Sequence, residues 1–68
     1  MTYNFTIEKL SDKIIRVKFS SHSEFDSSLL AVKFHKFLKS ECVDYLSVVD
    51  CFVRKGDYTL GHIDLEIF

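Results

Sequence analysis

The residue types that most often carry chemistry are few in this chain and widely spaced. The histidines are His22, His35 and His62, and the cysteines are Cys42 and Cys51. No pair of them has the short spacing of a zinc-binding motif, so the sequence predicts no metal site. No serine or cysteine stands in a nucleophile motif, and no glycine-rich phosphate loop is present. We therefore expect a protein that is not an enzyme and needs no cofactor.

One pair of residues could still act together. Asp50 and His62 face each other across the predicted terminal hairpin if its turn is three residues long. A carboxylate beside an imidazole can tune a general base. Such a pair is far more often an ordinary cross-strand contact worth roughly a few tenths of a kcal/mol. We interpret it in that way.

The elements that position these residues follow from the apolar pattern. Alternation predicts strands over residues 3–8, 15–19, 45–54 and 59–68, because successive strand side chains point to opposite faces. Ser23 and Asp26 have the spacing of a capping box, which predicts a helix from about residue 24 to residue 40. The apolar stripe of this helix consists of Leu30, Phe34, Phe37 and Leu38.

At 68 residues the chain is long enough for one small domain with a thin core. We expect a single α+β domain over residues 1–68, with the layout ββαββ and the helix packed on one face of a four-stranded mixed sheet. The predicted strand order is 2-1-4-3, with the first and last strands parallel at the centre. These two strands have the most regular inward faces, which are Tyr3, Phe5 and Ile7 and, in the last strand, Ile63, Leu65 and Ile67.

In element order and lengths the chain resembles the β-grasp class and the small immunoglobulin-binding domains within it. The opening Met1-Thr2-Tyr3 is also shared with those domains. The resemblance implies the β-grasp sheet order. It implies no function, because one fold of this kind serves many functions.

The third predicted strand is the only one with apolar residues on both faces. Val49, Cys51 and Val53 can turn toward the single helix, while Val48 and Phe52 turn away from it. Together with Tyr58 and Leu60, the outward pair predicts an exposed apolar patch large enough for a protein interface. The alternative is that the strand twists or bulges and carries Val48 or Phe52 over the rim of the core.

A second candidate surface lies on the predicted helix. Lys33, Lys36 and Lys39 recur every three residues and could contact an acidic partner. The simpler interpretation is a solvated outer face, because the net charge is −1 and the pI is about 6.2. A nucleic-acid-binding domain usually has a pI above about 9.

The sequence shows no secretory signal and no apolar run long enough to span a membrane. We therefore expect a cytoplasmic protein with reduced cysteines. The favoured function is a small binding module, such as an inhibitor or adaptor that occludes a partner protein, and phage inhibitors and immunity proteins are often of this size. The alternative is a homo-oligomer, most simply a homodimer, assembled through the open sheet face or the edge of the third strand. Nucleic-acid or nucleotide contact through the lysine row is a weaker alternative.

Overall fold

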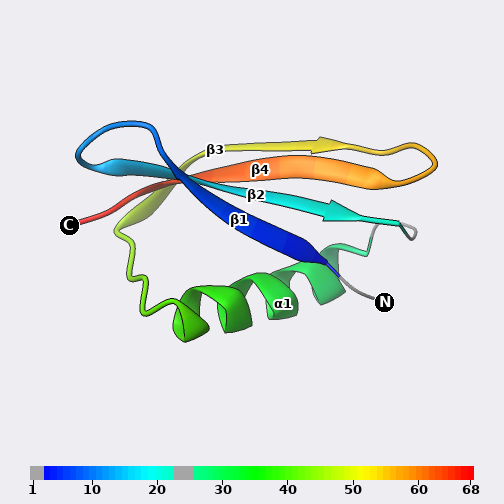
Figure 1. Ribbon diagram of the computed structural model, residues 1–68, viewed down its shortest axis with the longest axis horizontal. Helices are drawn as coiled ribbons and strands as arrows, with labels where there is room; N and C mark the ends of the chain where they lie inside the picture. Colours follow the sequence, from blue (N-terminus) through cyan, green and yellow to red (C-terminus); the bar gives the residue numbers. More distant parts are fainter. Residues whose placement is uncertain (1–2, 23–25) are drawn as a thin grey trace.

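The computed structural model describes residues 3–22 and 26–68 (Figure 1). It confirms a small α+β arrangement of four strands in one sheet with one helix on one face. The elements in chain order are β1 (Asn4–Lys9), β2 (Ile14–Ser21), α1 (Ser27–Ser40), β3 (Ser47–Arg54) and β4 (Thr59–Glu66).

The strand order differs from the prediction. The sheet has the order β1-β2-β4-β3, and all three neighbouring pairs are antiparallel. The expected order 2-1-4-3 is therefore wrong at the centre, because β4 pairs with β2 and β1 is an edge strand. The sheet is antiparallel rather than mixed, so the parallel central pair of the expected β-grasp order is not found among the described strands. The placement of β3 at an edge is confirmed.

The error has a physical reason. Regular alternation shows that one face of a strand is buried, but it does not show how many strands flank it. Arg16 of β2 lies directly opposite Asp64 of β4 on the outer face, and the two side chains are bonded. The outward residues of β1 (Asn4, Thr6 and Glu8) include no cation. If β1 flanked β4 in place of β2, Asp64 would face no positive charge.

The turns around the elements depend on short polar side chains. In the β1–β2 turn, Ser11 Oγ accepts a hydrogen bond from the Ile14 N–H at 3.2 Å. The helix begins at Ser27, and its N-cap is Asp26, whose carboxylate accepts bonds from the N–H groups of Ser28 and Leu29. The predicted start near residue 24 is therefore too early, and Ser23 lies outside the described residues.

The helix ends in a hydrogen-bonded turn. The Val43 N–H donates to the Leu38 carbonyl at 2.9 Å, and the Cys42 N–H donates to the Lys39 carbonyl at 3.2 Å. Cys42 has a φ of 55°, in the left-handed region that glycine usually occupies after a helix.

The core lies between α1 and the inner face of β1, β2 and β4. Its fully packed residues are Tyr3, Ile15, Val17, Phe19, Leu30, Phe34, Leu38, Ile63 and Leu65. The predicted helix stripe is thus largely confirmed, with Phe37 half-buried against Phe5 at a ring distance of 5.1 Å. β3 contributes none of these residues and only the half-buried Val53 beside them. In Figure 1, α1 lies on the β1 side of the sheet and β3 is the strand farthest from it.

None of the helical residues that the structure describes forms a segment long and apolar enough to cross a membrane.

Candidate protein-binding surface

The sheet face away from α1 is charged at its centre. Arg16 Nε lies 2.8 Å from Asp64 Oδ1, and Arg16 Nη2 lies 3.0 Å from Asp64 Oδ2. This two-bond geometry is the strongest that a guanidinium and a carboxylate can form. At the neighbouring position, Lys18 Nζ lies 3.7 Å from Glu8 Oε2. These pairs join β4, β2 and β1 across the outer face.

Asp64 is the buried member of this group, with a side chain only 8% exposed. The hydrogen bonds from Arg16 hold the pKa of Asp64 below its ordinary value, and the Coulomb attraction of Arg16 acts in the same direction. Burial opposes this shift, because it disfavours the charged carboxylate. The lowered pKa shows that Arg16 more than offsets the loss of solvation.

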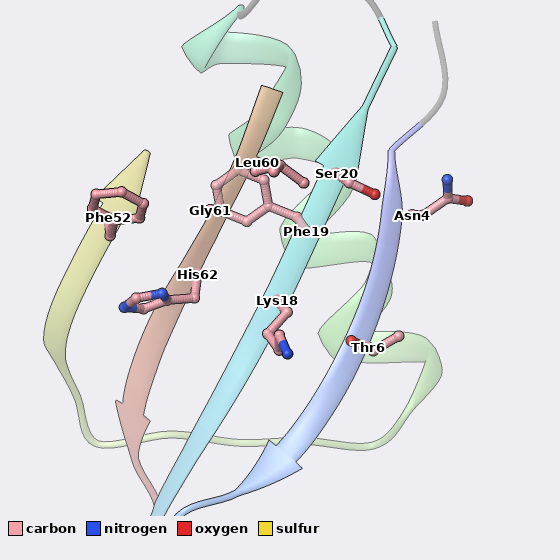
Figure 2. Close-up of a pocket in the computed structure, with 9 residues that line it drawn as sticks. All are labelled: Asn4, Thr6, Lys18, Phe19, Ser20, Phe52, Leu60, Gly61 and His62. Atoms are coloured by element: carbon pink, nitrogen blue, oxygen red, sulfur yellow. The ribbon is translucent and has the colours of Figure 1, made fainter. Parts of the chain in front are cut away.

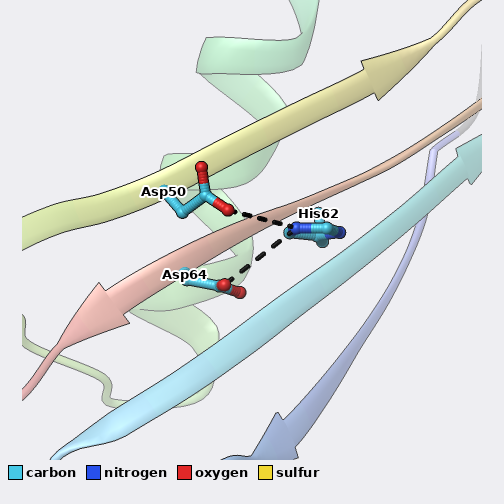
Figure 3. Close-up of side chains that lie close together, drawn as sticks. All are labelled: Asp50, His62 and Asp64. Atoms are coloured by element: carbon cyan, nitrogen blue, oxygen red, sulfur yellow. Dashed lines mark ion pairs between the residues drawn. The ribbon is translucent and has the colours of Figure 1, made fainter.

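Asp50, His62 and Asp64 come together beside this pair (Figure 3). His62 Nε2 lies 3.9 Å from Asp50 Oδ2 and 4.0 Å from Asp64 Oδ2. Two carboxylates and an imidazole can bind a divalent cation, but Arg16 already bonds both oxygens of Asp64. The positive guanidinium opposes a cation at that position. We therefore interpret the cluster as polar contacts beside the Arg16–Asp64 ion pair, with His62 between Asp50 of β3 and Asp64 of its own strand.

The predicted contact between Asp50 and His62 is present, but its register differs. Phe52 lies directly opposite His62, and Asp50 lies opposite Asp64. The loop between β3 and β4 spans residues 55–58, so it is longer than the three-residue turn on which the prediction depended.

A shallow hollow of about 380 Å³ opens on the outer face (Figure 2). Its apolar side is formed by Leu60 and by Phe52, whose ring stacks on that of His62 at 5.6 Å. Phe19 and Gly61 line it between β2 and β4, and its polar side consists of Asn4, Thr6, Lys18 and Ser20. The hollow therefore offers apolar surface beside polar groups, which is typical of a protein contact.

β3 is exposed along nearly its whole length. Val48 is 52% exposed, Val49 is 56% exposed and Phe52 is 50% exposed, and Cys51 is also on the surface. We expected the helix to cover the face with Val49 and Cys51, and that expectation is wrong. Because α1 lies toward β1, β3 is left uncovered on both faces.

A β-bulge changes the direction of the first part of this strand. Val48 pairs with Leu65 and Asp50 pairs with Asp64, so Val49 is the extra residue. Leu65 is buried on the helix side, and register places Val48 on that side as well. The predicted outward position of Val48 beside Phe52 is therefore wrong.

The predicted patch is thus divided among three places. Phe52 and Leu60 line the same hollow, as expected. Tyr58 lies in the β3–β4 loop, where its ring is 5.5 Å from that of His22, and with Leu60 it lines a smaller hollow. Val48 lies apart on the other face of the sheet.

The lysine row lies on α1, as predicted. Lys36 and Lys39 are exposed and Lys33 is half-buried. Within the described part of the chain, none of the three forms an ion pair.

Sequence reasoning did not find the Arg16–Asp64 pair or the exposure of β3 on both faces. Opposite charges at outward positions of the second and fourth strands were the available signal for the pair. A bulge in the third strand that moves Val48 was the stated alternative, but its position at Val49 had no signal, because an extra residue is located only after the register is known.

The fold and surface define the class: a small α+β protein with a helix on one sheet face and an uncovered apolar edge strand. The chain matches no protein-family model, and neither the curated proteins nor the solved structures contain a significant match.

Proposed function

We propose that this protein is a small, non-catalytic protein-binding module that docks on a partner protein through β3 and the adjoining hollow. The observation that carries the proposal is the exposure of β3 on both faces, with Val49 and Phe52 each at least half exposed. Apolar side chains on an open strand edge are costly to leave in water and prone to pair with another chain. A partner that covers them removes both problems.

The hollow supports the same surface. Phe52 is both a wall of the hollow and the central aromatic side chain of β3, so one partner element can contact both. Partly exposed aromatic residues next to a recess are the usual centres of binding energy. An inhibitor or adaptor that blocks a partner's working surface is the form of this function we favour. The free thiols of Cys42 and Cys51 support action in the reducing cytoplasm.

Affinity capture with matched variants tests the proposal. Phe52→Asp places a charge at the centre of the surface, while Val32→Asp does the same at an equally exposed position on α1, where Val32 is 52% exposed. We expect wild type and Val32→Asp to recover the same protein from native lysate, and Phe52→Asp to lose it. Equal recovery by all three proteins would place the binding surface elsewhere.

A photo-crosslinking amino acid at Val49 gives a second readout. We expect it to crosslink to the protein that the capture experiment recovers, and the same group at Val32 to crosslink to it much less. Adducts that are equally abundant from both positions would contradict docking through β3.

A further inference from the structure

We infer that β3 pairs antiparallel with β3 of a second copy of this chain, with Phe52 opposite Phe52 of that copy. The inference rests on the proposed function, because it requires β3 to be a docking strand, and it names the partner. The joined strands would make one continuous sheet from the two four-stranded sheets.

The backbone of β3 has hydrogen-bonding groups that face away from β4. The Phe52 carbonyl points to β4, where it meets the position that a side chain on Gly61 would occupy. Since strand residues alternate, Cys51 and Val53 direct their N–H and C=O groups outward. Because none of the described strands lies on that side, the Cys51 N–H donates to the side chain of the preceding residue, Asp50 Oδ1, at 2.9 Å.

Symmetry limits the possible registers. In an antiparallel pair related by a two-fold axis, side chains that lie opposite must be on the same face of the sheet. The two-fold axis must therefore lie midway between one residue and the same residue of the second copy. The bulge at Val49 interrupts regular pairing at one end, which leaves the segment from Asp50 to Arg54.

Charge selects one register within this segment. Centring on Phe52 places Asp50 opposite Arg54 of the second copy, and symmetry repeats the pair on the other side. Both residues lie on the outer face, since Asp50 pairs with Asp64 and Arg54 pairs with Leu60. Opposite charges directly across a strand pair stabilise it, whereas like charges destabilise it.

The neighbouring registers lack this complementarity. If the two-fold axis lies at Asp50, the two Asp50 carboxylates face each other. If it lies at Cys51, Asp50 of one copy faces Phe52 of the other. Centring on Val53 places Phe52 against Arg54. Among these alternatives, only the Phe52 register neutralises both charges and joins the two aromatic rings at the centre.

The same register satisfies the outward backbone groups. Cys51 lies opposite Val53 of the second copy, and such a pair exchanges both of its N–H···O bonds. The Cys51 N–H then leaves Asp50, which becomes free to contact Arg54 of the second copy. Within residues 3–22 and 26–68, Arg54 forms no ion pair that would compete.

Charge reversal tests the register directly. In Asp50→Arg both facing positions become positive, and in Arg54→Asp both become negative, so each variant repels its own copy. An equal mixture of the two variants restores both opposite-charge pairs in a heterodimer. We expect sedimentation velocity to show wild-type dimers with a Kd of roughly 10–100 µM, since the paired segment is short.

Each single variant should dimerise at least about tenfold more weakly, and the mixture should return to within about threefold of wild type. The matched controls, Asp12→Arg and Lys36→Asp, make the same charge changes at exposed positions away from β3. They should dimerise like wild type. Circular dichroism of each variant verifies the fold.

A disulfide gives a readout that does not depend on charge. Phe52→Cys in a Cys42→Ser/Cys51→Ser background should form an intermolecular disulfide. In the proposed register the two residues at position 52 are a non-hydrogen-bonded pair, whose Cα atoms lie about 4.5 Å apart. Val32→Cys in the same background should not form one.

The outcomes separate the possibilities. A wild type that stays monomeric to about 1 mM overturns the self-pairing, while capture that depends on Phe52 would still uphold docking on a foreign protein. A dimer that ignores the charge reversals, or a mixture that stays monomeric, overturns the register. If the wild type dimerises but the capture experiment recovers no other protein, the self-pairing of β3 stands and docking on a foreign protein is contradicted.

Discussion

β4 has a strand on each side, and these two neighbouring strands differ in how much of their apolar surface is buried. On one side, β2 places the buried Val17 opposite Ile63 and bonds Arg16 to Asp64. On the other side, β3 leaves Val49 and Phe52 in solvent, although its residues are as apolar. The difference does not come from composition. It comes from the position of α1, which packs on the inner face of β1, β2 and β4 and leaves β3 uncovered (Figure 1). The comparison teaches that the central pair specifies the fold and that β3 is available for binding.

The largest effect is expected when one apolar side chain is truncated to alanine in each region. Leu65 has no exposed surface, so Leu65→Ala should lower the free energy of unfolding by about 3 kcal/mol. Val49→Ala removes methyl groups that are already in water and should change it by less than about 0.5 kcal/mol. Urea denaturation of both variants gives the two values. Similar losses would show that β3 is part of the core.

The two glycines give the next contrast. A side chain on Gly61 would lie 2.5 Å from Phe19 Cζ and would also meet the Phe52 carbonyl oxygen. Gly61→Ala must therefore move β3 or the Phe19 ring, and we expect a loss of about 2 kcal/mol of unfolding free energy. The control is Gly56→Ala, whose new side chain would meet only the Tyr58 carbonyl oxygen at 3.8 Å.

Gly56→Ala should change stability by less than about 1 kcal/mol in the same urea titration. If the two substitutions cost the same, the close approach of β3 to β4 at Gly61 is not required.

These contrasts also show what the sequence could and could not predict. Alternation identified all four strands and the buried faces of β2 and β4, because one-sided burial leaves a period of two. It could not identify the neighbours of each strand, which depend on contacts such as that between Arg16 and Asp64. Phe52 and Leu60 were placed correctly on the outer face, although the hairpin register is shifted from the predicted one.

Val48 was placed on the wrong face because one extra residue reverses the alternation beyond it. The exposure of Val49 could not be predicted either. It depends on where α1 crosses the sheet, and the helix sequence fixes which face of α1 is buried but not the strands that it covers.

The pair of Arg16 with the buried Asp64 gives a smaller effect that depends on pH. Asp64→Asn should lower the free energy of unfolding by about 1 kcal/mol at pH 7, because Arg16 loses its charged partner. Asp50→Asn, at an exposed carboxylate of β3, should have a smaller effect. Folding lowers the pKa of Asp64 from its ordinary value of 3.8, so its contribution is present above that value.

That contribution is lost as the pH falls through 3.8 toward the lowered pKa of the folded state. Urea denaturation between about pH 7 and pH 2.5 should therefore show a smaller acid-induced loss in Asp64→Asn than in Asp50→Asn. Parallel curves for the two variants would contradict the role of Asp64.

The smallest effect separates the two cysteines. Cys42 has a φ of 55° at the end of α1, where a side chain is strained and glycine is not, so Cys42→Gly should raise the unfolding free energy by about 0.5 kcal/mol. Cys51 lies in extended backbone of β3, and Cys51→Gly should lower it by a similar amount, because glycine weakens a strand. Both thiols are exposed, so neither change removes core packing. Opposite signs in urea denaturation would therefore report backbone conformation alone, and a loss in both variants would show that the Cys42 side chain contributes more than its strain costs.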